Sequence, residues 1–265
     1  MSNKPGVIMH PILAQIGPIT LRWWGIMVAL GILAGIWVAY REAIRVGLDG
    51  EKVLDFAFWA VLSGFLGARL WELIFTYENF ADQPWRALMF WEGGLSIQGA
   101  VLGGLVAAIW FIRKYKLNFW QWADILAPGV ILGQAIGRVG CLLNGDAFGI
   151  PINSWLGVRY APGTPAYSAF GDTPLFPAEI MEGAWDLAIF SLLLVYRKKK
   201  PFEGSLALGY FFLYSLGRFT LEFWRADSLT TIMNLKAAQI TSAIVALVAL
   251  VIFLVKKASP RQKQC

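Results

Sequence analysis

The stretch that decides the fold is DILAPGVILGQAIGRVGCLLNGDAFGIP, residues 124–151. It begins as an apolar helix of membrane character and ends in a polar loop. Where the two meet it places, within ten residues, Gly137, Arg138, Gly140, Asn144 and Asp146. An arginine at the centre of a bilayer costs on the order of 3 kcal/mol, so Arg138 should face protein, water or substrate. The glycines beside it allow a helix or a ligand to approach closely. The alternative is a helix-packing face whose arginine reaches the lipid headgroups.

The composition of the 265 residues is that of a polytopic membrane protein. Apolar residues make up 57% and charged residues 15%, and the mean hydropathy is +0.57, which excludes a soluble globule. The net charge of +6 could suggest nucleic acid. However, the basic residues gather at the ends of apolar segments and form no long block, so we expect no nucleic-acid partner. The two cysteines, Cys141 and Cys265, cannot form a disulfide framework.

Seven apolar segments have about the 20-residue length that a membrane-spanning helix needs. They cover residues 19–40, 53–76, 95–112, 119–138, 178–196, 204–223 and 236–255. We therefore predict an all-α fold, a single integral-membrane domain over residues 1–265. It should be a polytopic bundle of seven transmembrane helices.

The basic residues predict how this bundle is oriented. Clusters of lysine and arginine follow the first, third and fifth segments and close the chain. Since cytoplasmic loops carry the excess of lysine and arginine, the N-terminus should lie outside and the C-terminus in the cytoplasm. Residues 141–177 then form an outer-face loop. A connection of that length is usually functional, and it is a natural place for a soluble partner or a peptide to dock.

Four arginines are expected at the outer ends of the helices, and they indicate an anionic ligand. Arg69, Arg138 and Arg218 lie toward the outer ends of their segments, and Arg225 lies just past one. Arginine binds a phosphate with two parallel hydrogen bonds, so a lipid headgroup would explain them. Arg218, Glu222 and Arg225 stand at i, i+4 and i+7, on one helix face, where the glutamate would hold the arginines in position. A purely structural triad is the alternative.

Three further features are weaker. Trp24 stands beside Arg22 and Trp23 in LRWWG, where an aromatic belt at the membrane surface is the simplest explanation. The run WEGGLSIQGAVLGG, residues 91–104, contains Gln98 and Gly99. It is typical either of irregular backbone beside a wet cavity or of glycines that pack helices. Glu179 and Glu182 begin the fifth segment, where the helix dipole favours carboxylates anyway. No spacing typical of a metal site or of a Ser-His-Asp triad is present.

Together these motifs resemble the prolipoprotein diacylglyceryl transferase family, bacterial inner-membrane enzymes. The resemblance covers nearly the whole chain through, in order, LRWWG, GARLWE, GGLSIQGAVLGG, ADILAPGVILGQAIGRVGCLLNGDAFG, PAEIMEG and GRFTLEFWR. It implies transfer of diacylglyceryl from phosphatidylglycerol to the thiol of the lipobox cysteine of prolipoproteins, which forms a thioether and releases glycerol 1-phosphate. It also implies a multi-pass protein of the bacterial plasma membrane with an active site that faces the outer leaflet. No cofactor or metal is implied.

The resemblance assigns expected roles to particular residues. Arg138 and Arg218 would clamp the phosphate, with Arg225 in support, and Glu222 would orient the arginines. Asp146 and Asn144 would shape the glycerol and thiol end. The expected substrate-binding set is completed by Gln98, which could hydrogen-bond the headgroup, and by Trp24, Gly99, Gly137 and Gly140. A carboxylate such as Asp146 or Glu222 is a candidate acceptor for the thiol proton.

The chain departs from the family pattern at several positions. The pattern G-R-x-G-N-x-x-N-x-E appears as GRVGCLLNGD, so Cys141 replaces Asn and Asp146 replaces Glu. The remaining departures are Trp24 for Tyr, Gln98 for His and Phe176 for His. The only histidine is His10. The chemistry is plausible without one, because a thiol of pKa near 8.5 is already partly ionised and arginines can neutralise the leaving phosphate.

Two other functions are alternatives to this one. The first is a catalytically impaired relative that binds lipid or lipoprotein, which the missing histidine motivates. The second is a transporter or channel. The internal charges gather at one depth and no inverted repeat is visible, which disfavours that class.

Overall fold

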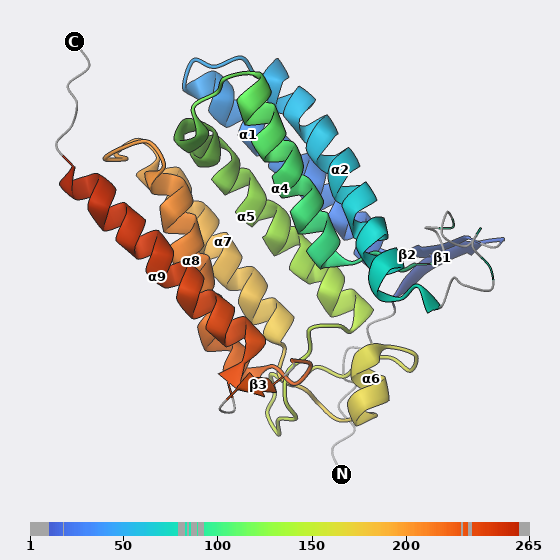
Figure 1. Cartoon of the computed structure of the whole chain (residues 1–265). Helices are drawn as coiled ribbons and strands as arrows, with labels where there is room; N and C mark the ends of the chain where they lie inside the picture. The colour runs from blue at the N-terminus through green and yellow to red at the C-terminus, as the bar shows by residue number, and fades with distance from the viewer. Residues whose placement is uncertain are drawn as a thin grey trace. The chain divides into compact units, whose positions relative to one another are not determined.

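The computed structural model describes residues 11–17, 19–78, 83, 85, 89, 93–228, 230–232 and 235–259. His10 and Cys265 lie outside these ranges. The chain divides into two compact units, one formed by residues up to 38 and from 123 onward, the other by residues 39–122. Helix α1, Trp23–Arg45, and helix α5, Phe119–Asn144, each contribute to both units. The elements are labelled in Figure 1.

The larger unit is a helical bundle with a structured polar end. Its long helices are most of α5 with α7, α8 and α9, which run side by side in Figure 1, and the first part of α1. The bounds of the remaining elements are α6, Pro165–Phe170; α7, Ala178–Tyr196; α8, Ser205–Leu221; the 3-10 turn η3, Glu222–Trp224; and α9, Ala237–Ala258. Two short antiparallel hairpins complete it: β1, Ile12–Ile16, with β2, Ile19–Arg22; and β3, Thr230–Ile232, with β4, Leu235–Lys236.

A buried carboxylate ties two helices of the larger unit together. Asp124 of α5 is 3% exposed and caps the N-terminus of α8. Its carboxylate accepts hydrogen bonds from the backbone N–H groups of Gly204, Leu206 and Ala207 at 2.9–3.0 Å, and Lys200 Nζ lies 3.0 Å away. The first N–H groups of a helix have no partner within it, so Asp124 supplies the missing acceptors from a neighbouring element. An apolar core from α5, α7 and α8 lies beyond it, around Ile131 and Leu206.

Glycines let α1 and α5 approach closely. A β carbon placed on Gly31 would lie 2.8 Å from the carbonyl oxygen of Gly133, and one placed on Gly35 would lie 2.8 Å from that of Gly129. Neither distance leaves room for a side chain. The small residues therefore set the spacing of these two helices, as they commonly do in membrane proteins.

The smaller unit contains the helix pair α2, Glu51–Phe75, and α4, Ile97–Lys114. A β carbon on Gly99 would lie 2.2 Å from Gly67 O, and one on Gly103 would lie 2.1 Å from Ser63 O. Gly99 and Gly103 are thus packing glycines inside a helix. Of the two explanations for the glycine-rich run, these two positions support helix packing. Gly93 and Gly94 precede the helix and form irregular backbone, with positive φ values of 101° and 73°.

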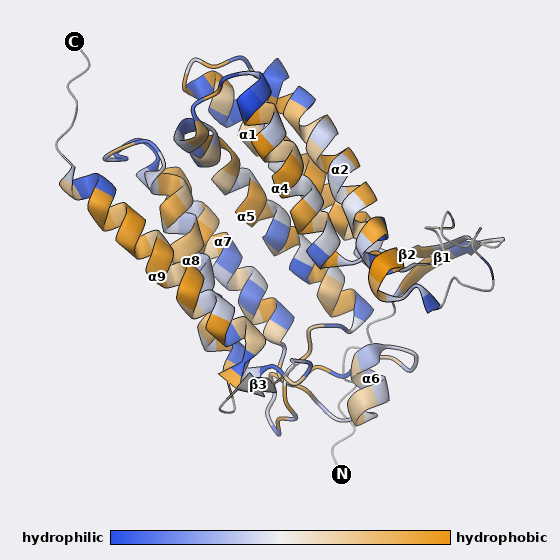
Figure 2. Cartoon of the chain, in the orientation of Figure 1, coloured by the Kyte–Doolittle hydropathy of each residue, from blue (hydrophilic) through white to orange (hydrophobic). Residues whose placement is uncertain are grey.

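Five helices of the described residues are long and apolar enough to cross a membrane: α1, α2, α4, α5 and α9. Their apolar side chains are widely exposed, for example Leu247 at 62% and Val255 at 61% on α9, which suits a lipid surrounding. Figure 2 shows hydrophobic residues along most of α9 and hydrophilic ones within α7. The protein is therefore a helical membrane protein with at least these five candidate spans.

The predicted segments coincide with helices in the described part of the chain, but some boundaries differ. The first helix begins at Trp23, not at residue 19, because residues 19–22 pair with β1 as a strand. Helix α5 continues to Asn144, so the predicted loop at 141–177 begins only at Gly145. That connection is a folded segment. It contains α6 and a small core formed by Phe148, Tyr160, Ala166 and Leu175.

Candidate functional site

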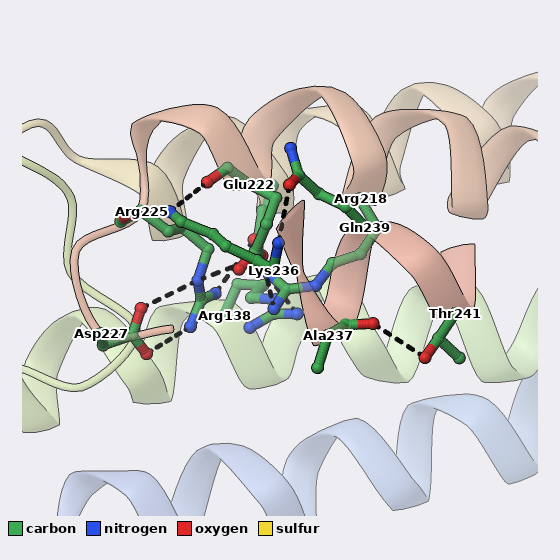
Figure 3. Close-up of polar contacts among 10 residues, drawn as sticks. Arg138, Arg218, Glu222, Arg225, Asp227, Lys236, Ala237, Gln239 and Thr241 are labelled. Carbon is green, nitrogen blue, oxygen red and sulfur yellow. Dashed lines mark hydrogen bonds and ion pairs between the residues drawn. The ribbon is translucent and has the colours of Figure 1, made fainter. Parts of the chain in front are cut away.

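Three arginines converge on one carboxylate, that of Glu182 on α7. Arg138 Nη2 of α5 lies 2.8 Å from Glu182 Oε2 as an ion pair. Arg218 Nη1 of α8 and Arg225 Nη1, which follows η3, both donate hydrogen bonds to Glu182 Oε1, the latter at 3.0 Å. The Glu182 side chain is 5% exposed. We call Glu182 and these three arginines the arginine cluster, and Figure 3 shows its guanidinium groups with their neighbours.

Two further carboxylates hold the arginines in place. Glu222 is fully buried, with Oε2 lying 2.9 Å from Arg218 Nη2 and 3.8 Å from Arg225 Nε. Asp227 accepts two hydrogen bonds from Arg225, from Nε at 3.0 Å and from Nη2. Burial by itself lowers the pKa of Arg225, but the carboxylates of Glu182 and Asp227 more than offset it and raise the pKa. Arg225 therefore stays charged.

The backbone around Arg225 explains how it reaches the cluster. Helix α8 ends at Leu221, the next three residues form η3, and Arg225 is extended with φ −84° and ψ 140°. Lys236 Nζ donates to the carbonyl oxygens of Glu222, at 2.6 Å, and of Arg225. Hydrogen bonds from Ile150 N to Trp224 O and from Ala226 N to Phe148 O attach this turn to the long connection. Arg225 is thus not on the face of α8, contrary to the sequence prediction, and it reaches Glu222 and Glu182 from the turn.

Glycines also shape this end of the bundle. A β carbon on Gly183, next to Glu182, would lie 3.3 Å from Arg138 Cβ, so the glycine lets α5 bring its arginine against α7. One on Gly217, next to Arg218, would lie 2.1 Å from Trp185 Nε1, which donates a hydrogen bond to Leu213 O at 3.0 Å. Close packing of α5, α7 and α8 is therefore what allows short contacts between their charges.

A small cavity lies among the charged groups. It is lined by Arg138, Glu182, Asp186, Tyr214, Arg218 and Leu221, among others, and its volume is about 10 Å³. This is about the volume that one water molecule requires. A lipid phosphate is larger than this cavity.

A second polar group lies around the end of α5 and the start of α7. Asn144 Nδ2 donates to Asp146 Oδ2 at 2.7 Å, and the Tyr160 hydroxyl donates to Glu179 Oε1 at 2.8 Å. Burial first, and then the neighbouring carboxylates of Glu179 and Asp146, raise the pKa of Tyr160. Cys141 carries a free, partly buried thiol.

The other predicted substrate-binding residues lie in varied surroundings. The backbone of Trp24 packs beside α5, where a β carbon on Gly140 would lie 3.3 Å from Trp24 Cα. Gly137 faces open space, because a β carbon placed on it would meet no described atom within 4 Å. Gln98 belongs to the smaller unit, is exposed and accepts a hydrogen bond from Ser96 Oγ at 2.6 Å.

Arg69 also lies in the smaller unit, and its described hydrogen bonds are made there. It is 8% exposed, and its Nη1 donates to the carbonyl oxygens of Gly93 at 2.8 Å and Gly94 at 2.9 Å. The positive φ of these glycines turns both carbonyls toward one donor, which other residues would do only with strain. Arg69 therefore fixes the start of the glycine-rich run.

Sequence reasoning placed Arg138, Arg218, Glu222 and Arg225 together, and the structure confirms that they meet. It missed Glu182, the carboxylate they share, and it missed the supporting contacts of Asp227 and Lys236. A usable signal was present in the spacing of three acids, Glu179, Glu182 and Asp186, along an otherwise apolar helix. In the described part of the chain, no group of three or more histidine, cysteine, aspartate or glutamate side chains is arranged to hold a metal ion.

Comparison with known proteins identifies the family. Residues 11–255 match the family model described as prolipoprotein diacylglyceryl transferase. The chain belongs to the prolipoprotein diacylglyceryl transferase family. Its similar relatives include proteins named phosphatidylglycerol–prolipoprotein diacylglyceryl transferase from three bacteria. The one from Symbiobacterium thermophilum is 38% identical over 246 residues, which is 92% of this chain and 91% of the relative.

The other two relatives have similar sequence identity and coverage. The protein from Trichormus variabilis is 37% identical over 240 residues, 88% of this chain and 84% of its own length. That from Oceanobacillus iheyensis is 36% identical over 248 residues, 92% of this chain and 86% of its own. The match to the diacylglyceryl transferase family includes the arginine cluster and the whole connection between α5 and α7.

Proposed function

We propose that this protein transfers diacylglyceryl from phosphatidylglycerol to the thiol of the lipobox cysteine of prolipoproteins. The observation that carries the proposal is the arginine cluster, in which Arg138, Arg218 and Arg225 meet at Glu182. The sulfur attacks the C3 methylene of the diacylglyceryl group, a thioether bond forms, and the C3–O bond breaks. The electron pair leaves on the phosphate oxygen as glycerol 1-phosphate.

The arginines supply what this reaction demands. The leaving phosphate gains negative charge in the transition state, and guanidinium groups already fixed in place stabilise that charge without reorganisation. Arg138 and Arg218 hold the phosphate and Arg225 supports them. Glu222, buried between Arg218 and Arg225, orients both. No protein histidine is needed, because a thiol is already partly ionised near neutral pH.

The remaining predicted residues complete the substrate-binding surface. Asp146 and Asn144, which share a hydrogen bond, shape the glycerol and thiol end. Trp24, Gly137 and Gly140 of the larger unit also belong to this surface. Gln98 and Gly99 of the smaller unit stay predictions from the sequence, and Gly99 packs against Gly67.

The membrane arrangement follows from the distribution of charge. We infer one integral-membrane domain with seven spans, in which α7 and α8 join the five apolar helices. Helix α7 carries three acids and α8 has only 17 residues, but α7 packs against α8, α8 packs against α9, and both share an apolar core with α5. Lysines and an arginine directly follow the C-terminal end of α7, and two lysines occupy the last turn of α9, in both cases at the end opposite the arginine cluster. The positive-inside rule then places the N-terminus outside, the C-terminus in the cytoplasm and the site at the outer leaflet.

The test is direct transfer with purified protein. Phosphatidylglycerol vesicles and a lipobox peptide should yield a thioether-modified peptide and one glycerol phosphate per modified peptide, measured by mass spectrometry. A family member with the histidine that Gln98 replaces serves as the positive control. If that control reacts and this protein binds the lipid or peptide without reacting, it is a binding relative of the enzymes.

A further inference from the structure

Two carboxylates near Tyr160 have no role in proton transfer in the reaction proposed above. Glu179, the second residue of α7, is 0% exposed, and Asp146 stands two residues after Asn144, the last residue of α5. Tyr160 connects the two. Its hydroxyl donates a hydrogen bond to Glu179, and a β carbon on Gly145, the residue before Asp146, would lie 3.1 Å from Tyr160 Cδ1.

In each carboxylate one oxygen accepts a hydrogen bond and the other, called open below, accepts none from the described residues. Tyr160 fixes Glu179 Oε1 and Asn144 fixes Asp146 Oδ2. The second oxygens, Glu179 Oε2 and Asp146 Oδ1, are buried and accept no hydrogen bond from the described residues. Buried polar atoms without a partner are costly and rare, so this pair of open acceptors calls for a role. A donor that the substrate brings would satisfy both.

The carboxylates of the arginine cluster are less suited to accept a proton. Glu182 contacts three guanidinium groups, so protonating it would weaken three ion pairs at once. Glu222 also has a buried oxygen, Oε1, without a hydrogen bond from the described residues, but protonating Glu222 would weaken the ion pair of its Oε2 with Arg218. Asp227 is paired with Arg225. Glu179 and Asp146 can each accept a proton on an open oxygen without giving up an existing hydrogen bond.

We propose that Asp146 and Glu179 together accept the proton that the lipobox thiol releases, which rests on the transferase function proposed above. Asp146 is a partly exposed residue, and its carboxylate receives the proton from sulfur. Glu179 is wholly buried and acts through Asp146 as a positioning residue that shares this proton. As the S–H proton passes to the pair, the S–C3 bond forms, the C3–O bond breaks and the electron pair leaves on the phosphate.

The charged and titratable groups that face Glu179 come from three elements. Tyr160 and Asp146 come from the long connection, Arg225 from the turn after η3, and Cys141 from the end of α5. The Tyr160 hydroxyl remains a donor when its carboxylate partner is replaced by an amide. Glu179→Gln therefore keeps the hydrogen bond to Oε1 and removes only the charge and the proton-accepting oxygen.

The size of the effect follows from thiol chemistry. A thiol of pKa about 8.5 is about 3% thiolate at pH 7. If the variant must rely on this fraction, Glu179→Gln should lower kcat about 30-fold at pH 7. The loss should shrink to about twofold at pH 8.5, where half of the thiol is ionised. KM for phosphatidylglycerol should stay within twofold, since the arginine cluster is untouched.

A second peptide separates this role from a structural one. A lipobox peptide with selenocysteine in place of cysteine carries a selenol that is ionised at neutral pH and needs no acceptor. Glu179→Gln should modify this peptide at a rate within twofold of the unsubstituted protein. The matched control is Asp186→Asn, which alters another buried acid of α7 with an unpaired oxygen, and it should leave the cysteine-to-selenocysteine rate ratio unchanged.

The outcomes are distinct. If Glu179→Gln lowers the rate equally for both peptides, or by a factor that does not depend on pH, Glu179 only supports the structure and the proposal is overturned. An unchanged rate with the cysteine peptide overturns it as well. If Glu179→Gln fails to fold, Asp146→Asn is measured in the same way, and an equal loss with both peptides overturns the proposal. Absence of transfer to either peptide by the unsubstituted protein would instead refute the transferase function.

Discussion

Replacing Glu182 with alanine should destabilise the larger unit strongly, because it leaves three guanidinium groups, none more than 19% exposed, without their shared acceptor. The Glu182 side chain is 5% exposed, and Arg138 has its described ion pair with Glu182 alone. Removing one partner of a buried ion pair costs about 3–5 kcal/mol. Arg218 and Arg225 retain Glu222 and Asp227, so we expect about 3 kcal/mol, or about a 100-fold change in the unfolding equilibrium.

The assay is reversible unfolding in mixed detergent micelles, followed by tryptophan fluorescence and far-UV circular dichroism. The matched control is Asp172→Ala, which removes an ion pair with Arg159 whose side chains are 75% and 35% exposed. An exposed pair is worth about 0–1 kcal/mol, so this variant should unfold almost as the unsubstituted protein does. Glu182→Gln keeps one acceptor and should fall between the two. If Glu182→Ala and Asp172→Ala differ by less than about 0.5 kcal/mol, the arginine cluster is not held together as described.

Three more substitutions test separate parts of the account. Asp124→Ala should lower stability by about 3 kcal/mol in the same unfolding assay, because the α8 N-terminus loses the acceptor for three N–H groups; a loss under about 1 kcal/mol would contradict this. Lys236→Met should lower transfer activity about tenfold, because Arg225 is displaced when its carbonyl loses the lysine. The loss should be in kcat and not in KM for the lipid. Unchanged kinetics would show that the turn holds its shape without the lysine. Gln98→Ala should lower activity less than about tenfold, since an exposed amide contributes about one hydrogen bond; a larger loss would assign the glycine-rich run a greater role.

Local spacing explains which parts of the site could be read from the sequence. Arg218 and Glu222 are one helical turn apart, so their contact follows from helix geometry alone, and the structure has it at 2.9 Å. The role of Glu182 could not be read in this way. Its partners come from α5, α8 and the turn after η3, and only the packing of these elements brings them to α7.

The same reasoning applies to the fold. Continuous apolar runs predict helices of roughly the right extent, because length and hydropathy suffice for that. They did not distinguish residues 19–22, which the prediction included in the first span but which pair with β1 instead. The connection after α5 has too few apolar residues for a membrane-spanning helix, and the hydrogen bond from Tyr160 of its small core to Glu179 of α7 is one that no local pattern reveals.

The central claim is that fixed guanidinium groups hold the lipid phosphate, and Arg138→Lys tests it most directly. Lysine keeps the charge but cannot form two parallel hydrogen bonds to one phosphate. The rate of thioether formation from phosphatidylglycerol and a lipobox peptide should fall about 100-fold or more, while the unfolding transition shows a folded protein. Full activity of a folded Arg138→Lys variant would contradict the account.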